Sequence, residues 1–313
     1  MNTIADGAIP TDAHHLLCHK SSLAMQRKSF LKLTAALPLA FAAMKLKDFG
    51  QLANTLEPSD TMPLLFIGHG NPMNAITDNE WRRSWVELGQ KLSPPKAILV
   101  ISAHWLTRGT HVTMNERPET IHDFGGFPQE LFQQEYPAPG AVDYAKMVIE
   151  GVESVPVHES YEWGLDHGTW SVLKPMFPEA RIPVFQLSID YYKPIQYHYD
   201  LARELAFLRS KGVLIIGSGN VVHNLRAIVP NHPTLDWAAE FDAFVKEKIE
   251  NKDHQALVDY QRAGKLAQLA HPTNDHYLPL LYVLGLRNEK DNLEFFNETF
   301  DMGSISMRSM IFN

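Results

Sequence analysis

Short apolar runs of the sequence end at residues 67, 101 and 216, and a histidine follows each of them. These histidines are His69, His104 and His223. A fourth candidate, His276, lies in a Pro-containing loop just before an apolar stretch with helical spacing, and His271 in the same loop is a weaker candidate. Imidazole is the commonest protein ligand for zinc, non-haem iron and copper. The pattern therefore predicts a site for a divalent metal ion.

Each of these histidines, taken alone, also has a purely structural interpretation, because an isolated histidine near a strand end is usually just hydrogen-bonded. The joint pattern and the cysteine content favour the metal. The chain contains one cysteine, Cys18, which lies before any expected folded core. Thiolate zinc sites, iron–sulfur clusters, disulfide scaffolds and thiol nucleophiles are thereby excluded. Any metal ligands must be His, Asp or Glu.

Two further segments combine a histidine with glycines, carboxylates and aromatic rings. Residues 162–170 contain His167 and residues 122–128 contain His122. We interpret the first segment as part of a pocket for an aromatic substrate, with His167 as a proton-transfer residue. An ordinary Gly-rich turn with buried aromatic side chains is the alternative for both segments, and for the His122 loop the two interpretations are nearly equal.

The elements that must position these side chains alternate along the chain. Apolar runs at 64–67, 97–101, 182–189 and 213–216 predict buried strands. Helical spacing predicts helices at 79–92, 144–152, 197–208, 235–249, 254–269 and 277–284, and 304–312 is expected to form a last strand. We therefore expect an α/β fold with a single domain, in which helices cover both faces of a central, mostly parallel sheet. Ligands of such sheets bind beyond the carboxyl ends of the strands.

The first sixty residues differ from the rest. A segment with three basic residues, Arg27, Lys28 and Lys32, precedes a short apolar stretch, 33–44. This order is the pattern of an export signal. Arg27-Lys28 resembles a twin-arginine motif with lysine in the second position, and an N-terminal amphipathic helix is the alternative. The apolar stretch is too short for stable membrane insertion. We expect residues 1–60 to be an export-signal-like segment and linker, 61–313 to be the catalytic domain, and the location to be cytoplasmic, or periplasmic if the signal works.

The overall charge limits the class of partner. The 313 residues carry a formal net charge of −8, whereas a protein that binds nucleic acid through its phosphates needs a basic face. No G-x-S-x-G nucleophile elbow, dinucleotide fingerprint or P-loop pattern is present. We expect no nucleic-acid partner, and the sequence leaves a homo-oligomer open.

Several of these segments, in this order, resemble the 4,5-DOPA extradiol dioxygenase family, which belongs to the class III extradiol ring-cleavage dioxygenases. The resemblance covers nearly all of 62–312. It rests on Gly68-His69-Gly70-Asn71-Pro72-Met73, Ser102-Ala103-His104-Trp105, and residues 121–128, 165–170, 219–224 and 272–280.

The resemblance implies a cofactor and a set of roles. It implies His69, His104 and His276 as metal ligands, His223 as a further ligand or a proton-transfer residue, and His167 as an acid or base beside the metal. It also implies Fe(II) in turnover, with Zn²⁺ plausible in the isolated protein. Because Asp275 adjoins His276, the sequence leaves open which of the two faces the ion.

The function expected from the resemblance is ring opening of a catechol such as DOPA, a small aromatic diol, with molecular oxygen. The enzyme would be an oxidoreductase that incorporates both atoms of O2. A zinc-dependent hydrolase that uses metal-bound water is one alternative. A catalytically silent metal-binding relative is the other.

Overall fold

The computed structural model of the chain describes residues 61–230 and 232–313. The predicted export-signal-like segment, residues 1–60, lies outside the described residues. Within the described part, no helix has both the length and the apolar character needed to cross a membrane.

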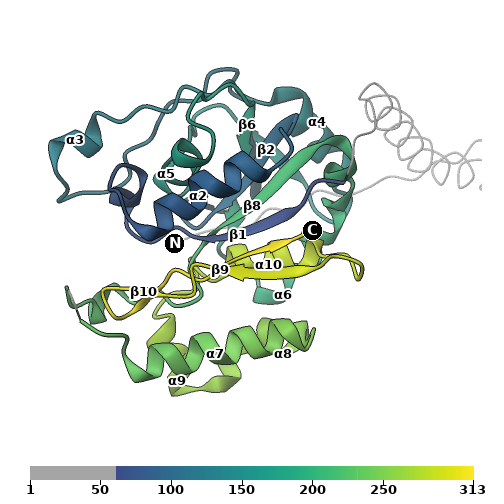
Figure 1. Ribbon diagram of the computed structural model, residues 1–313. Coiled ribbons are helices and arrows are strands. Elements are labelled where there is room, and N and C mark those ends of the chain that lie inside the picture. The colour runs from purple at the N-terminus through teal and green to yellow at the C-terminus, as the bar shows by residue number, and fades with distance from the viewer. Residues whose placement is uncertain (1–60, 231) are drawn as a thin grey trace, which may run out of the picture. The chain divides into compact units, whose positions relative to one another are not determined.

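A six-stranded sheet forms the centre of the fold (Figure 1), with the strand order β6-β2-β8-β1-β12-β9. The strands β6 (Val184–Gln186), β2 (Ala97–Ser102), β8 (Val213–Gly219) and β1 (Leu64–Gly68) run parallel. The last two, β12 (Ser309–Phe312) and β9 (Leu293–Phe296), pair antiparallel with their neighbours. The predicted α/β class with a mostly parallel central sheet is thus confirmed.

The strands β1, β2 and β8 consist of buried residues throughout, which explains why they read as continuous apolar runs. Alternate side chains point to opposite faces of the sheet. Leu64 and Phe66 belong to one apolar core, whereas Leu65 and Ile67 belong to the other. The fold therefore has two cores, one on each face of the sheet.

Different helices cover the two faces. The core on one face includes residues of α2 (Glu80–Lys91) and α5 (His167–Met176). The core on the other face includes residues of α4 (Val142–Gly151), α6 (Ile195–Glu204) and α10 (Leu278–Leu286). Figure 1 shows α2 and α5 on one side of the sheet, α6 and α10 on the other, and α7 (Asp236–Glu250), α8 (His254–Val258) and α9 (Lys265–Ala270) grouped beyond α10.

The starts of two helices are fixed by capping side chains. Asn79 accepts a hydrogen bond from the Arg82 backbone at the start of α2, and Asp166 accepts one from the Thr169 backbone at the start of α5. Such caps satisfy backbone N–H groups that have no partner within the helix. The cap at Asp166 fixes where α5 begins, and therefore where its first residue, His167, lies.

Smaller ladders flank the central sheet. They join β3 (Leu106–Thr107) to β7 (Ile189–Asp190), β4 (Thr110–Thr113) to β5 (Val157–Ser160), and β10 (Phe300–Asp301) to β11 (Ile305–Ser306). The short helix α3 (Gln129–Phe132) follows the His122 loop.

Four predicted elements are broken in the structure. The predicted helix 197–208 divides into α6 and the 3₁₀ helix Ala206–Lys211. The predicted helix 254–269 divides into α8 and α9, because Gly264 between them has a φ of 62° that a helix does not allow. The predicted strand 182–189 divides because Ser188 leaves β2 and its backbone N–H bonds to His111 instead. The predicted final strand 304–312 divides into β11 and β12.

Candidate metal centre

The five histidines singled out by the sequence come from five separate segments. His69 directly follows β1, His104 lies two residues beyond β2, and His223 follows β8. His167 is the first residue of α5, and His276 lies two residues before α10. Because β1, β2 and β8 are neighbouring parallel strands, their carboxyl ends deliver three of these side chains to one edge of the sheet.

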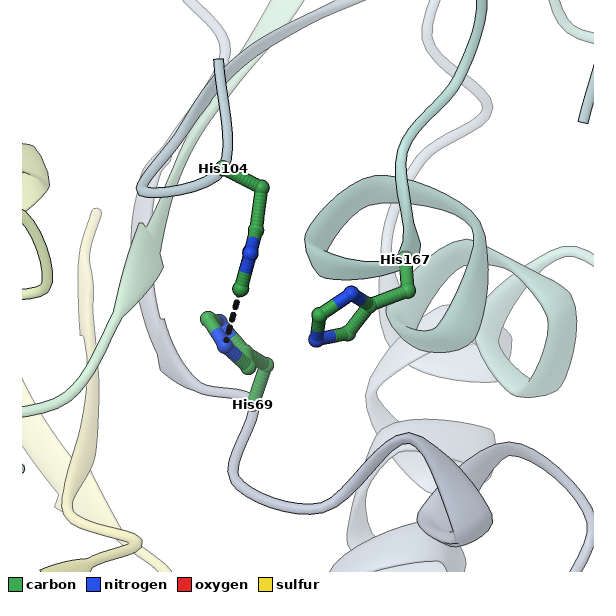
Figure 2. Close-up of side chains that lie close together, drawn as sticks. All are labelled: His69, His104 and His167. Carbon is green, nitrogen blue, oxygen red and sulfur yellow. Dashed lines mark hydrogen bonds between the residues drawn. The ribbon is translucent and has the colours of Figure 1, made fainter. Parts of the chain in front are cut away.

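The imidazoles of His69, His104 and His167 converge (Figure 2). A nitrogen of each ring lies within 4.8 Å of a nitrogen of the other two. Their ring centroids are 5.1 Å apart for His69 and His104, and 3.8 Å apart for His104 and His167. His69 and His167 are buried and His104 is partly buried.

His276 and His223 belong to the same cluster of rings. The His276 centroid lies 5.2 Å from that of His69 and 5.0 Å from that of His104. The His223 ring stacks on His276 with the centroids 3.5 Å apart and the planes at 4°. The structure therefore brings all five predicted histidines together.

Hydrogen bonds determine which nitrogen of His69 carries a proton. His69 Nδ1 lies 2.9 Å from the Ser218 hydroxyl oxygen. That hydroxyl donates its own proton to the Gly168 carbonyl at 2.6 Å, so it can only accept from the imidazole. His69 Nδ1 must then carry the proton, and Nε2 is left with a lone pair.

One carboxylate acts in the same way on two histidines. Asp123 Oδ2 lies 3.2 Å from His104 Nδ1, and Asp123 Oδ1 lies 3.0 Å from His167 Nδ1. Oδ1 also accepts the His167 backbone N–H at 2.9 Å. The contact to His167 Nδ1 is electrostatic, because its geometry is not that of a hydrogen bond. An ionised carboxylate attracts a proton on the nearer nitrogen, so Asp123 favours the tautomer of each ring in which Nδ1 carries the proton and Nε2 keeps its lone pair.

Asp275 holds His276 rather than facing the cavity. His276 Nδ1 donates to Asp275 Oδ2 at 2.9 Å, which leaves the Nε2 lone pair free. His276 lines the cavity at this edge of the sheet, and Asp275 does not. On this geometry His276 is the ligand candidate and Asp275 orients it.

The arrangement fits a divalent metal ion. His104 Nε2 and His69 Nε2 lie 3.1 Å apart, yet the contacts above assign the proton of each ring to Nδ1. Two lone pairs at this distance repel each other unless they share a cation. Two nitrogens bound to one ion at about 2 Å each lie about 3 Å apart, and neutral imidazole is a ligand for both zinc and iron.

Burial keeps the rings of His69, His167, His223 and His276 uncharged. Burial lowers the pKa of His69 and of His276 well below 6.5, and the neighbouring imidazoles lower both further. Burial also lowers the pKa of His223 to about 3. The pKa of His167 is lowered by burial and by His104, although Asp123 opposes the change. Neutral rings are ready to bind a metal near pH 7 without first losing a proton.

The pKa of Asp123 moves in the direction that keeps it ionised. Burial alone would raise it, but the contacts with His104 and His167 outweigh burial and hold the pKa below its ordinary value of 3.8. Asp123 therefore stays ionised near pH 7, and its negative charge faces the Nδ1 atoms of both imidazoles.

The cluster opens into a cavity of about 510 Å³. This volume is in the range of pockets that bind small molecules. All five histidines line it, together with Asp123 and mostly apolar neighbours: Pro72, Phe124, Phe127, Leu225, Ile228, Met302 and Ile305.

Two weaker sequence candidates do not line this cavity. The His122 side chain bonds to the Gln134 carbonyl and packs near Trp170. His271 is buried, and its Nε2 donates to the Val221 carbonyl. Both have the structural role that the sequence left as an alternative, although Phe124 and Phe127 of the His122 loop do line the cavity.

Three polar groups of the site were missed at the level of sequence. Asp123 and Ser218 are described above. Asp166 is fully buried and accepts hydrogen bonds from the Ser102 hydroxyl and the Gln186 amide, both at 2.7 Å. Ser102 in turn accepts the His104 backbone N–H at 3.2 Å. The one available signal was position, because Asp123 and Asp166 each adjoin a histidine in a Gly-containing loop.

The fold and the site together define an α/β enzyme with a cluster of imidazoles at the carboxyl edge of its sheet. Residues 69–312 match the family described as the catalytic LigB subunit of aromatic ring-opening dioxygenase. The match spans most of the chain, and the chain belongs to this family.

Named relatives agree with this assignment. The chain is 47% identical over 259 residues to a 4,5-DOPA dioxygenase extradiol of Escherichia coli (strain K12), which covers 80% of this chain and 95% of the relative. It is 37% identical over 254 residues to one of Beta vulgaris, which covers 79% of this chain and 95% of the relative. A crystal structure of an uncharacterized protein from Escherichia coli K12 matches with a TM-score of 0.70 and 42% identity, over 80% of this chain and 100% of that one.

The protein is accordingly a metal-dependent extradiol dioxygenase, an oxidoreductase that acts on an aromatic substrate with O2. The predicted family and class of enzyme are confirmed. The family match favours this class over the hydrolase considered from the sequence.

Proposed function

We propose that the protein opens the ring of a catechol, such as DOPA, outside the diol, with Fe(II) as the working metal. His69, His104 and His276 would bind the metal, with His223 as a fourth ligand. His167 would be the acid or base that exchanges protons with the substrate.

The observation that carries this proposal is the 3.1 Å approach of two unprotonated nitrogens, His69 Nε2 and His104 Nε2, at the inner end of the cavity. His276 and His223 lie beside them with a free Nε2 on His276. A diol and dioxygen would both need room beside the metal, and the cavity that these histidines line would supply that room.

The residues of the chain then have distinct tasks. Phe124, whose ring meets His167 edge to face at 5.5 Å, offers an aromatic wall to a planar ring. His167, neutral and with its Nδ1 proton held against Asp123, presents Nε2 as a base for a catechol hydroxyl. The same nitrogen can return the proton to the ring-opened product.

The identity of the metal follows from the chemistry required. When bound, Fe(II) supplies the electron transfer between substrate and dioxygen that ring opening needs. A set of neutral imidazoles also accepts zinc readily, so the isolated protein is expected to carry Zn²⁺ in part. Zinc has no redox chemistry, and a zinc-loaded sample should bind catechols without turning them over.

The test is oxygen consumption together with a new visible absorbance, measured with the full chain loaded anaerobically with Fe(II) and then given catechol or DOPA. We expect both signals with Fe(II) and neither with Zn²⁺. Absence of both signals, with iron in the site verified by metal analysis, would reject the proposed function. Activity with zinc in the absence of oxygen would instead favour a hydrolase.

Variants separate the two kinds of histidine. His69→Ala and His104→Ala should lose metal, whereas His167→Gln should retain metal and lose at least a hundredfold in kcat, since general acid–base catalysis contributes about 10²- to 10⁴-fold. His158→Ala on β5, an exposed histidine outside the cavity, is the matched control and should change neither.

Three further proposals complete the description. We propose 61–313 as the catalytic domain and 1–60 as an export-signal-like segment and linker. We place the protein in the cytoplasm, or in the periplasm if that segment is functional, with a homo-oligomer compatible with the fold. Its partners would be a small aromatic diol and O2, with neither nucleic acid nor stable membrane insertion.

A further inference from the structure

We propose that Asp166 is a positioning residue of the candidate metal centre, which sets the relative places of three imidazoles through one network of buried hydrogen bonds. The three are His69, His104 and His167, which converge in Figure 2. Asp166 is not among the residues that line the cavity, so it acts through these rings and not on the substrate. The inference rests on the proposed function for the roles of the rings as metal ligands and proton-transfer residue.

The Asp166 carboxylate is fully buried, and both of its oxygens accept hydrogen bonds. Oδ1 accepts from the Ser102 hydroxyl at 2.7 Å and from the Thr169 backbone N–H at 3.1 Å. Oδ2 accepts from the Gln186 amide at 2.7 Å and from the Trp163 indole at 3.4 Å. These partners belong to β2, α5, β6 and the loop before α5. Any movement of the carboxylate leaves a buried donor without a partner, which is costly, so its position is fixed.

The first branch of the network leads to His104. Ser102 is the last residue of β2, and its hydroxyl donates to Asp166 and accepts the His104 backbone N–H at 3.2 Å. The space around this contact is small, because a Cβ at Gly168 would lie 2.5 Å from Ser102 Oγ and 2.9 Å from His104 Cδ2. The path of the chain from β2 to His104 is therefore tied to Asp166 through one hydroxyl group.

The second branch leads through α5 to the other two rings. Asp166 caps α5, whose first residue is His167. One residue further along, the Gly168 carbonyl accepts the Ser218 hydroxyl at 2.6 Å, and the Ser218 oxygen lies 2.9 Å from His69 Nδ1. A shift in the first turn of α5 would therefore move the ring of His167 and, through Ser218, the ring of His69.

Three rings on three separate elements need such a common support. A nitrogen of each ring lies within 4.8 Å of a nitrogen of the other two, yet the rings follow β1, follow β2 and begin α5. Groups that bind a metal or transfer a proton must be held within about 0.5 Å of the productive geometry. A carboxylate bonded to the end of β2 and to the start of α5 holds these elements at a fixed spacing.

Asp166→Asn tests the proposal, because the amide keeps the volume of the side chain but replaces one acceptor oxygen by a donor. If the amide oxygen keeps the bonds to Ser102 and Thr169, its NH2 group meets the NH2 group of Gln186, and two donors cannot bond. The protein is loaded with Co²⁺, whose visible absorption bands report the geometry of its ligands. We expect these bands to change and the Co²⁺ affinity, measured against a chromophoric chelator, to be about tenfold lower.

The double variant Asp166→Asn/Gln186→Glu separates positioning from general destabilisation. A carboxylate at 186 accepts from the amide at 166, and it can still accept the backbone N–H of residue 166, as the Gln186 carbonyl oxygen does at 3.3 Å. The network is then restored with donor and acceptor exchanged, and the number of buried carboxylates is unchanged. We expect the Co²⁺ bands and affinity of the double variant to match those of the parent.

Two further variants test one branch and provide the control. Ser102→Ala cuts the branch to His104 and leaves the cap of α5 intact, so it should change the Co²⁺ bands without the Asp166 substitution. Ser171→Ala on α5 is the matched control, because Ser171 is buried and its hydroxyl has no hydrogen-bond partner among the described residues. Its bands and affinity should be those of the parent.

The outcomes separate this proposal from the proposed function. Parent-like Co²⁺ bands and affinities in Asp166→Asn and Ser102→Ala would overturn the positioning role, even if urea denaturation showed lower stability. A folded double variant that keeps the defect of Asp166→Asn would overturn it too, since the hydrogen bonds would not be the cause. Ring opening by the Fe(II)-loaded parent tests the proposed function separately, and its absence would leave a positive Co²⁺ result standing for Asp166.

Discussion

At the scale of single residues, the candidate metal centre depends on which nitrogen of each imidazole carries the proton. Ser218, Asp123 and Asp275 each occupy an Nδ1 atom, so that the Nε2 atoms of His69, His104 and His276 are left with lone pairs. Asp123 is unusual among them because one carboxylate fixes two rings, His104 and His167, through different oxygens. The same side chain therefore links a proposed ligand with the proposed proton-transfer residue.

Asp123→Asn tests this link. The amide keeps the volume of the side chain but has one acceptor instead of two, so one of the two imidazoles must change its tautomer or lose its partner. We expect metal affinity to fall by about 10- to 100-fold, which is the usual effect of removing a group that orients a metal ligand. Competition with a chromophoric chelator measures this affinity.

Asp143→Asn on α4, an exposed position, is the matched control and should leave metal affinity unchanged. Parent-like affinity in Asp123→Asn would show that the tautomers of His104 and His167 are fixed by something other than this carboxylate.

At the scale of secondary-structure elements, the end of β8 sets the position of the loop before α10. The Asn220 backbone N–H donates to the His276 carbonyl at 2.9 Å. Gly219 allows this approach, because a Cβ at this position would overlap that same carbonyl oxygen. The close contact between strand and loop is what brings His276 beside the histidines that follow β1 and β2.

Gly219→Ala should therefore displace His276. We expect a loss of about 1–3 kcal/mol in the free energy of unfolding, which is the usual cost of an extra methyl group in a packed region, together with weaker metal binding. Urea denaturation and the chelator competition measure the two effects.

Gly125→Ala provides the comparison, because a Cβ at Gly125 would meet no heavy atom within 4 Å, and its stability should equal that of the parent. If Gly219→Ala were as stable as the parent and bound metal equally well, the contact between β8 and the loop would not be what positions His276.

At the scale of the whole molecule, buried histidines make folding depend on pH. His198 on α6 is fully buried, and its Nδ1 lies 3.1 Å from the Tyr282 hydroxyl of α10. Burial lowers the pKa of His198 to about 4. Between pH 6.5 and pH 4 the unfolded chain takes up a proton at this residue and the folded chain does not, so the free energy of unfolding falls as the pH falls through this window.

Replacing this histidine should make the protein less sensitive to acid. A difference of about 2.5 pKa units corresponds to about 2 kcal/mol of stability lost between pH 7.5 and pH 5. His198→Gln cannot titrate, so its loss of stability between those two pH values should be about 2 kcal/mol smaller than that of the parent. Urea denaturation at both pH values checks this.

His158→Gln, which replaces an exposed histidine, should retain the pH dependence of the parent. An equal pH dependence in His198→Gln and the parent would mean that His198 is protonated alike in the folded and unfolded chains.

The sequence by itself determined the class of fold and the candidate histidines. Buried parallel strands are apolar along their whole length, so the apolar runs 64–67, 97–101 and 213–216 could be predicted as strands. Ligands bind beyond the carboxyl ends of such strands, and this rule indicated the residues that follow each run. His167 and His276 were also found, through an aromatic, Gly-containing segment and a loop before an apolar helix. Each of these predictions depends on residues that are neighbours in the chain, and a single sequence shows such neighbours directly.

The tertiary structure alone decided which atoms face each other. Sequence treated His271 and His276 as members of one loop, but only the packing of that loop against β8 turns His276 into the cavity and leaves His271 bonded to the Val221 carbonyl. Likewise, Asp123 becomes a partner of His104 and His167 because tertiary packing brings its carboxylate within 3.2 Å of one ring and 3.0 Å of the other. Hydrogen bonds act over about 3 Å, whereas the segments that supply their donors and acceptors lie far apart in the chain, and their approach depends on how all the elements pack together.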